Sequence, residues 1–128
     1  MNLRQAALGA AALDAGAIVA FSAIGRASHD EGVLGESGLG LATTASPFLT
    51  GAALGWLLAR AWRRPCDGKR TGVIVWASTL VGGMVLRAVY GQGVQVSFVL
   101  VAGAVLAVFL IGWRVVSGWI ATRRGLKP

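Results

Sequence analysis

The chain has 128 residues, of which 55% are hydrophobic and only 13% are charged, and its mean hydropathy is +0.69. A soluble domain usually carries about 25% charged residues, so this composition argues against a soluble globule. The net charge of +7 does not indicate nucleic-acid binding, because the bases lie at the ends of long apolar blocks and are not interleaved with base-stacking aromatic residues. We therefore expect an all-α membrane protein with a lipid bilayer, and no nucleic acid, as its partner.

Four apolar blocks predict a bundle of four transmembrane helices in one domain, residues 1–128. The first block, from about residue 6 to 25, is too long for the apolar region of a signal peptide, and we expect it to be retained. Each block has about 20 residues or more, enough to cross ~30 Å of hydrocarbon at ~1.5 Å per residue. The other three blocks extend over about residues 39–61, 71–90 and 94–119.

The distribution of bases predicts the orientation. Ten of the twelve Lys and Arg residues fall at the N-terminus, between the second and third blocks, or from Arg114 onward, whereas Arg26 and Arg87 lie toward the other side. Cytoplasmic loops collect Lys and Arg, so we expect both termini in the cytoplasm and the chain in the cell (inner) membrane. Four tryptophans are expected to form an aromatic belt at the same boundary: Trp56, Trp62, Trp113 and Trp119.

Asp14 is the principal candidate for chemistry, because it falls near the middle of an apolar block and is expected near the bilayer centre. An unpaired carboxylate there costs about 2.5 kcal/mol or more, so it must be protonated, paired with a cation or exposed to a wet cavity. It is either a proton or ligand site or an interhelical hydrogen-bonding group. Arg87 is a possible partner, and Arg114 is the alternative ion-pair partner, although a cytoplasmic interface anchor is the favoured interpretation of Arg114.

Polar residues on the second and third helices extend this candidate site. Thr79 shares a helix face with Arg87, and Thr50 lies close to Pro47, which frees a backbone carbonyl in the preceding turn. Hydroxyl groups beside such a proline either line a polar cavity or bond to their own backbone. The candidate substrate or proton pathway consists of Asp14, Arg87, Thr79 and Thr50.

Small residues at four-residue spacing predict close helix contacts, either within the chain or across a homodimer. Gly51 and Gly55 form one such pattern on the second helix. Another lies on the first helix, at Ala12, Gly16 and Ala20.

No motif indicates an enzyme, a cofactor or a metal. Cys66 is the only cysteine and is expected to be a reduced thiol in a cytoplasmic loop. The run 28–31, which contains His29, is expected to be a solvated loop because adjacent residues rarely converge on one ion. No nucleophile–base triad or phosphate-binding glycine loop is recognisable in the sequence.

The order of these features resembles a known family. The resemblance covers nearly the whole chain and rests on Asp14, Phe21, Ile24-Gly25-Arg26, Ser28-His29, Pro47-Phe48, Gly55-Trp56, Trp76, Thr79, Gly83, Arg87 and Gly112-Trp113-Arg114. These residues resemble short prokaryotic four-helix membrane proteins classified as domain of unknown function 3054. The resemblance implies a four-helix membrane protein and adds no activity.

Two functions remain open at this point. The first is a small proton-coupled transporter or channel built around Asp14 and acting as a homodimer, similar in plan to small multidrug exporters. The second is a non-enzymatic accessory subunit or scaffold of a larger membrane complex, in which Asp14 holds helices together. An intramembrane lipid enzyme is a third and weaker hypothesis, since one Asp–Arg pair offers little for catalysis.

Overall fold

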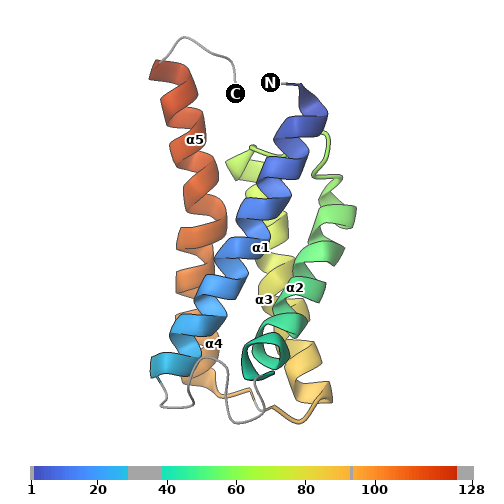
Figure 1. Cartoon of the computed structure of the whole chain (residues 1–128), viewed down its shortest axis with the longest axis vertical. Coiled ribbons are helices and arrows are strands. Elements are labelled where there is room, and N and C mark those ends of the chain that lie inside the picture. The colour runs from blue at the N-terminus through green and yellow to red at the C-terminus, as the bar shows by residue number, and fades with distance from the viewer. Residues whose placement is uncertain (1, 29–38, 93, 124–128) are drawn as a thin grey trace.

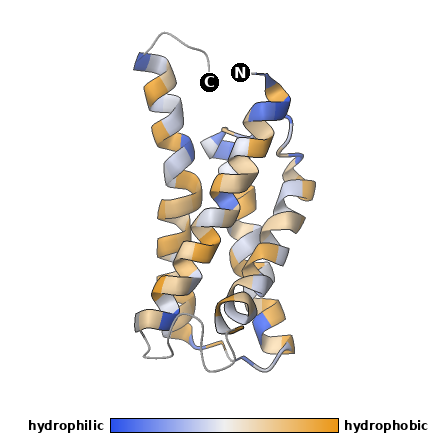
Figure 2. Cartoon of the chain, in the orientation of Figure 1, coloured by the Kyte–Doolittle hydropathy of each residue, from blue (hydrophilic) through white to orange (hydrophobic). Residues whose placement is uncertain are grey.

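A computed structural model describes residues 2–28, 39–92 and 94–123, and these residues contain helices and no strand (Figure 1). The helices form four spans that are long and apolar enough to cross a membrane, which confirms the predicted four-helix bundle (Figure 2). The fourth span consists of three consecutive segments. The elements are α1 (Leu3–Ser28), α2 (Gly40–Ala59), η1 (Gly68–Gly72), α3 (Val73–Val89), α4 (Val96–Leu106), η2 (Ala107–Ile111) and α5 (Gly112–Arg123).

The helix ends differ from the predicted blocks for local reasons. α1 is longer than the apolar block 6–25 because the helix continues through polar residues at both ends, including Arg4 and Arg26. α2 ends at Ala59, two residues before the predicted end. Arg60 takes a left-handed conformation with φ of 50°, and its backbone N–H donates to the carbonyl of Leu57, which closes the helix.

α2 and α3 pack with their backbones close together, because glycines on α2 leave no side chain between them. A Cβ atom on Gly51 would lie 2.8 Å from the backbone oxygen of Ser78, and one on Gly55 would lie 2.9 Å from the Ser78 Cβ. The Ser78 hydroxyl donates to the Gly51 carbonyl at 2.7 Å. The prediction that Gly55 faces another helix is confirmed, and this small-residue pattern is used within the chain.

The backbone carbonyl that Pro47 leaves without a helical donor connects α2 to the link between α3 and α4. A proline at this position cannot donate to the carbonyl of Thr43, four residues earlier. That carbonyl accepts instead from the side-chain amide of Gln92 at 3.2 Å and from the Ser46 hydroxyl at 3.3 Å. The hydroxyl groups near Pro47 therefore bond to the backbone, which is the second of the two alternatives that the sequence left open; Thr50 likewise donates to the Ser46 carbonyl at 2.8 Å.

Aromatic contacts in the core determine which face of α1 points into the bundle. Phe21 packs edge-on against Phe48 of α2 with 5.3 Å between ring centroids, and Phe98 of α4 lies 6.3 Å from both rings. Phe21 lies on the same face of α1 as Ile18 and Asp14, at a spacing of three and four residues. All three side chains are buried. The aromatic contacts thus turn Asp14 toward the inside of the bundle.

Candidate functional site

Asp14 lies inside the bundle with only 2% of its surface exposed, and four N–H groups converge on its carboxylate. Arg114 donates from Nη1 to Oδ1 at 2.8 Å and from Nη2 to Oδ2 at 2.7 Å. The indole of Trp113 donates to Oδ1, and the indole of Trp56 donates to Oδ2, both at 2.8 Å. These residues come from α1, α2 and α5, and together they form what we name the Asp14 cluster: Asp14, Trp56, Trp113 and Arg114.

Arg114 is as buried as its partner, with 1% of its surface exposed. Beyond Asp14, its Nε donates to the carbonyl of Pro65 at 2.8 Å, and its Nη1 donates to the carbonyl of Leu110 at 2.9 Å. Its guanidinium also lies 4.5 Å from the ring centroid of Trp113. A buried charge is tolerated when it is paired and hydrogen-bonded, and both conditions hold here. The expectation that Arg114 anchors the chain at the membrane interface is therefore wrong.

The segment η2 (Ala107–Ile111) is a short π-helical turn, and it aligns Arg114 with the core. Four buried residues of the last span are spaced by four residues each: Ala102, Leu106, Leu110 and Arg114. In a regular α-helix of 3.6 residues per turn, that spacing drifts around the axis by roughly 120° over twelve residues. The wider turn at residues 107–111 takes up part of this drift, and π turns of this kind are frequent at functional sites.

The geometry leaves the Asp14 carboxylate fully engaged. A carboxylate offers about four lone-pair positions, and four N–H donors occupy them, two at each oxygen. Bidentate Arg–carboxylate pairs are among the strongest and most directional polar contacts in proteins. Among the described residues, no buried side-chain nitrogen or oxygen lacks a hydrogen-bond partner. In this conformation the cluster joins three helices and holds no acceptor open to a substrate.

The other candidate residues lie away from Asp14. Arg87 bonds at the far end of the bundle to the side chain and the backbone of Gln92, at 3.2 and 3.3 Å, and its guanidinium lies 4.5 Å from the ring centroid of Phe98. Thr79 is buried and donates to the Val75 carbonyl at 2.6 Å, within its own helix. Thr50 is exposed. The structure brings Asp14 together with Arg114 and does not bring it together with Arg87, Thr79 or Thr50.

Sequence reasoning missed two members of the cluster. Trp56 and Trp113 were expected in an aromatic belt, yet both indoles point inward to Asp14, whereas Trp62 and Trp119 are exposed. Buried indole N–H groups usually find a hydrogen-bond acceptor. The sequence offered one signal for this role of the tryptophans, namely a carboxylate in the apolar spans that needed hydrogen-bond donors. Trp56 lies three residues before the last residue of α2, so the cluster is close to one end of that helix and not at its middle.

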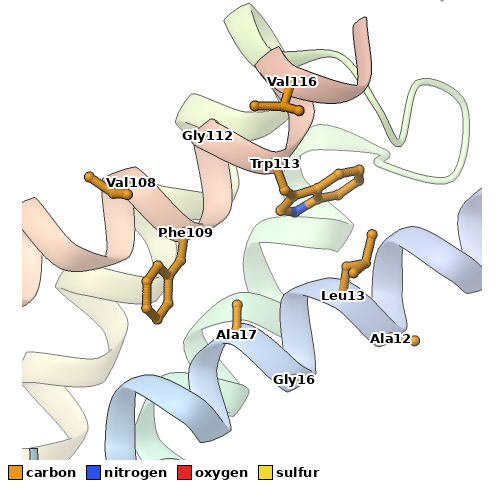
Figure 3. Close-up of a pocket in the computed structure, with 9 residues that line it drawn as sticks. All are labelled: Ala12, Leu13, Gly16, Ala17, Val108, Phe109, Gly112, Trp113 and Val116. Atoms are coloured by element: carbon orange, nitrogen blue, oxygen red, sulfur yellow. The ribbon is translucent and has the colours of Figure 1, made fainter. Parts of the chain in front are cut away.

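An apolar groove of about 560 Å³ lies beside the cluster, between α1 and the last span (Figure 3). Trp113 belongs to both, because its ring lines the groove while its N–H donates to Asp14. The remaining lining residues are apolar: Ala12, Leu13, Gly16, Ala17, Val108, Phe109, Gly112 and Val116.

Within the described ranges, no group of three or more His, Cys, Asp or Glu residues is placed to hold a metal ion. His29 and its acidic neighbours lie outside the described residues. Cys66 is partly buried in the connection between α2 and η1, next to Pro65.

Comparison with known proteins places the chain in a family. No curated protein and no solved structure matches it significantly. A family model described as "Protein of unknown function (DUF3054)" matches residues 11–117, a range that contains all four members of the Asp14 cluster. The match covers most of the 128 residues and agrees with the resemblance noted in the sequence. The chain therefore belongs to the DUF3054 family of membrane proteins, whose function is unknown.

Proposed function

We propose that this protein is a non-enzymatic subunit or scaffold of the inner cell membrane, with both termini in the cytoplasm, and that the Asp14 cluster is structural. The single observation that carries this proposal is the complete engagement of the Asp14 carboxylate by four N–H donors from α2 and α5. The most conspicuous polar group of the spans is thus used to hold the bundle together. What the protein presents to the bilayer is mainly apolar helix surface, suited to packing against other membrane helices.

A proton-coupled mechanism requires a change at Asp14 that its hydrogen bonds and ion pair oppose. A proton carrier must bind and release a proton during its cycle, and protonation of Asp14 would break its ion pair with Arg114. Arg114 would then remain buried without a counter-charge, which is strongly destabilising unless the arginine moves to water. Its further bonds to the carbonyls of Pro65 and Leu110 hold it in place. This reasoning favours a structural role over a transport role.

One observation keeps a transporter as the second candidate. Trp113 separates the Asp14 carboxylate from the groove between α1 and the last span, because the same indole contacts both. A displacement of α5 that withdrew Trp113 would open the cluster toward the groove. In such a mechanism the described conformation is a closed state, and a homodimer would provide the second wall of a pathway.

Two measurements separate the candidates. The first is purification of the tagged protein from its native membrane in mild detergent, followed by a second column. A subunit retains a partner at fixed stoichiometry through both steps, and the amount of that partner falls in cells that lack the protein. Recovery of the protein alone contradicts the subunit proposal.

The second measurement is proton flux into sealed proteoliposomes that contain a pH-sensitive dye, under an imposed pH gradient. A scaffold gives the same flux as empty vesicles, for the wild type and for Asp14→Asn alike. Flux in the wild type that is lost in a folded Asp14→Asn protein supports the transporter and overturns the structural assignment. Arg87→Gln serves as the matched control, because it removes a charge at the far end of the bundle.

A further inference from the structure

The groove between α1 and the last span is hollow because its walls carry glycines with no neighbours. A Cβ atom built on Gly16 or on Gly112 would meet no atom within 4 Å. This contrasts with Gly51 and Gly55 of α2, whose positions are filled by α3. The groove therefore remains open on the membrane-facing side of the bundle, flanked by Leu13 and Phe109 (Figure 3).

The groove has a defined depth relative to one end of the bundle. α1 begins and α5 ends at the same end, which we name the basic end (Figure 1). Ala12 follows Arg4 by eight residues, and Val116 precedes Arg123 by seven, which places the near end of the groove roughly 10–12 Å below these two arginines by helical rise. The far end, at Ala17 and Val108, lies roughly 20–22 Å below them. One leaflet accounts for about 15 Å of the ~30 Å hydrocarbon core. With these arginines in the headgroup region, which adds about 5–7 Å on each side, the groove extends through the acyl chains of the leaflet at the basic end, down to about the bilayer centre.

The basic end is strongly positive around the opening of the groove. Arg123 is exposed and lies on the same face of α5 as Gly112 and Val116, which precede it by eleven and seven residues. Arg4 is also exposed, but it lies on another face of α1, where it lines a separate hollow with Trp62. The guanidinium of Arg123 lies 5.1 Å from the ring centroid of Trp119, a residue type typical of the headgroup region. Asp67 is the only acid that the structure describes at this end. The other exposed bases there are Arg60, Arg63, Arg64, Lys69 and Arg70.

We propose that the groove binds an anionic phospholipid from the leaflet at the basic end, with one acyl chain along Gly16 and Gly112 and the phosphate on Arg123. The apolar lining suits an acyl chain, and the bases complement a negative headgroup. A second copy of the chain fits less well. Two copies with the same membrane orientation would bring their basic ends together, and like charges repel.

The test is a lipid titration of the purified full chain, with bound lipids counted by native mass spectrometry. The probes are phosphatidylglycerol, which is anionic, and phosphatidylcholine, which is zwitterionic. We expect the wild type to bind phosphatidylglycerol more tightly. Loss of the arginine in Arg123→Gln should weaken that binding about fivefold, while phosphatidylcholine binding is unchanged.

The matched charge control is Arg4→Gln, which removes one exposed charge from the same end of the bundle, on a face of α1 away from the groove. We expect a much smaller loss of phosphatidylglycerol binding in this variant. An equal loss in Arg123→Gln and Arg4→Gln would overturn the site, because it would show a diffuse attraction of the whole basic end. Unchanged phosphatidylglycerol binding in Arg123→Gln would overturn it as well.

A second pair of variants tests the acyl chain. Gly16→Leu/Gly112→Leu fills the groove and should reduce the retention of both lipids, whereas Ala53→Leu, which places a leucine at an exposed position of α2, should not. Wild-type dimers that dissociate when the groove is filled would identify a second copy as the occupant and contradict the proposal. If the filled variant does not fold, the two charge variants still decide the outcome.

Discussion

Arg114 meets Asp14 end-on, with its two terminal nitrogens 2.8 and 2.7 Å from the two carboxylate oxygens, although 100 residues separate the pair in the sequence. The contact joins the first helix of the chain to the last. Both partners are buried, and both complete their hydrogen bonding with groups from elsewhere in the bundle. The stability of the fold should therefore depend on the pair as a unit.

Asp14→Asn keeps the size of the side chain and removes its charge, leaving Arg114 buried without a counter-ion. We expect a loss of about 3–5 kcal/mol in the free energy of unfolding, measured by titration with a denaturing detergent. Arg114→Gln should cost a similar amount, and the double variant should be clearly more stable than the sum of the two losses predicts. Additive losses would show that the ion pair contributes nothing.

Arg87 provides the control for this cycle, since it bonds to Gln92 at the other end of the bundle. The losses from Asp14→Asn and Arg87→Gln should add within about 0.5 kcal/mol. A coupling larger than that would assign Arg87, and not Arg114, an energetic connection to Asp14.

Trp56→Phe and Trp113→Phe each remove one indole donor while retaining most of the aromatic surface. A hydrogen bond to a charged group contributes about 1.5–3 kcal/mol, so each variant should lose stability in that range. Trp62→Phe changes an exposed residue and should stay within about 0.5 kcal/mol of the wild type. If all three variants behave alike, the indole bonds to Asp14 are not energetically important.

Gly51→Ala tests the contact between α2 and α3. The added Cβ would stand 2.8 Å from the backbone oxygen of Ser78, which cannot move without shifting α3. We expect a loss of about 1–3 kcal/mol from overpacking. Gly9→Ala is the matched control, because nothing lies within 4 Å of its added methyl group, and it should be neutral or stabilising by up to about 1 kcal/mol. Equal melting temperatures for the two variants would contradict the close packing.

The orientation can be tested with single cysteines in a Cys66→Ser background. Val94 lies in the α3–α4 link, and Thr122 lies in the last turn of α5; both are exposed and stand at opposite ends of the bundle. In intact cells, an impermeant maleimide should label Val94→Cys, and it should label Thr122→Cys only after lysis. The reverse pattern would show that the basic end faces outward.

The sequence alone determined the class of the protein, the number of spans and their approximate ends. These properties follow from hydropathy summed over about twenty residues, which does not depend on what the helices touch. The glycine pair Gly51 and Gly55 was also recognisable, because small residues at four-residue spacing permit close helix contacts in any bundle. The sequence further showed that Asp14 needs compensation.

Only the tertiary structure decided which groups provide that compensation. Helical rise and side-chain direction left both Arg87 and Arg114 as partners for Asp14. The choice depended on the packing of α1 by Phe21 and on the π turn that aligns Arg114 with the core. The inward role of Trp56 and Trp113 was likewise invisible, because a tryptophan near a helix end has the same sequence signature at a lipid interface as beside a buried carboxylate. Which neighbour an indole N–H meets depends on how helices pack in three dimensions.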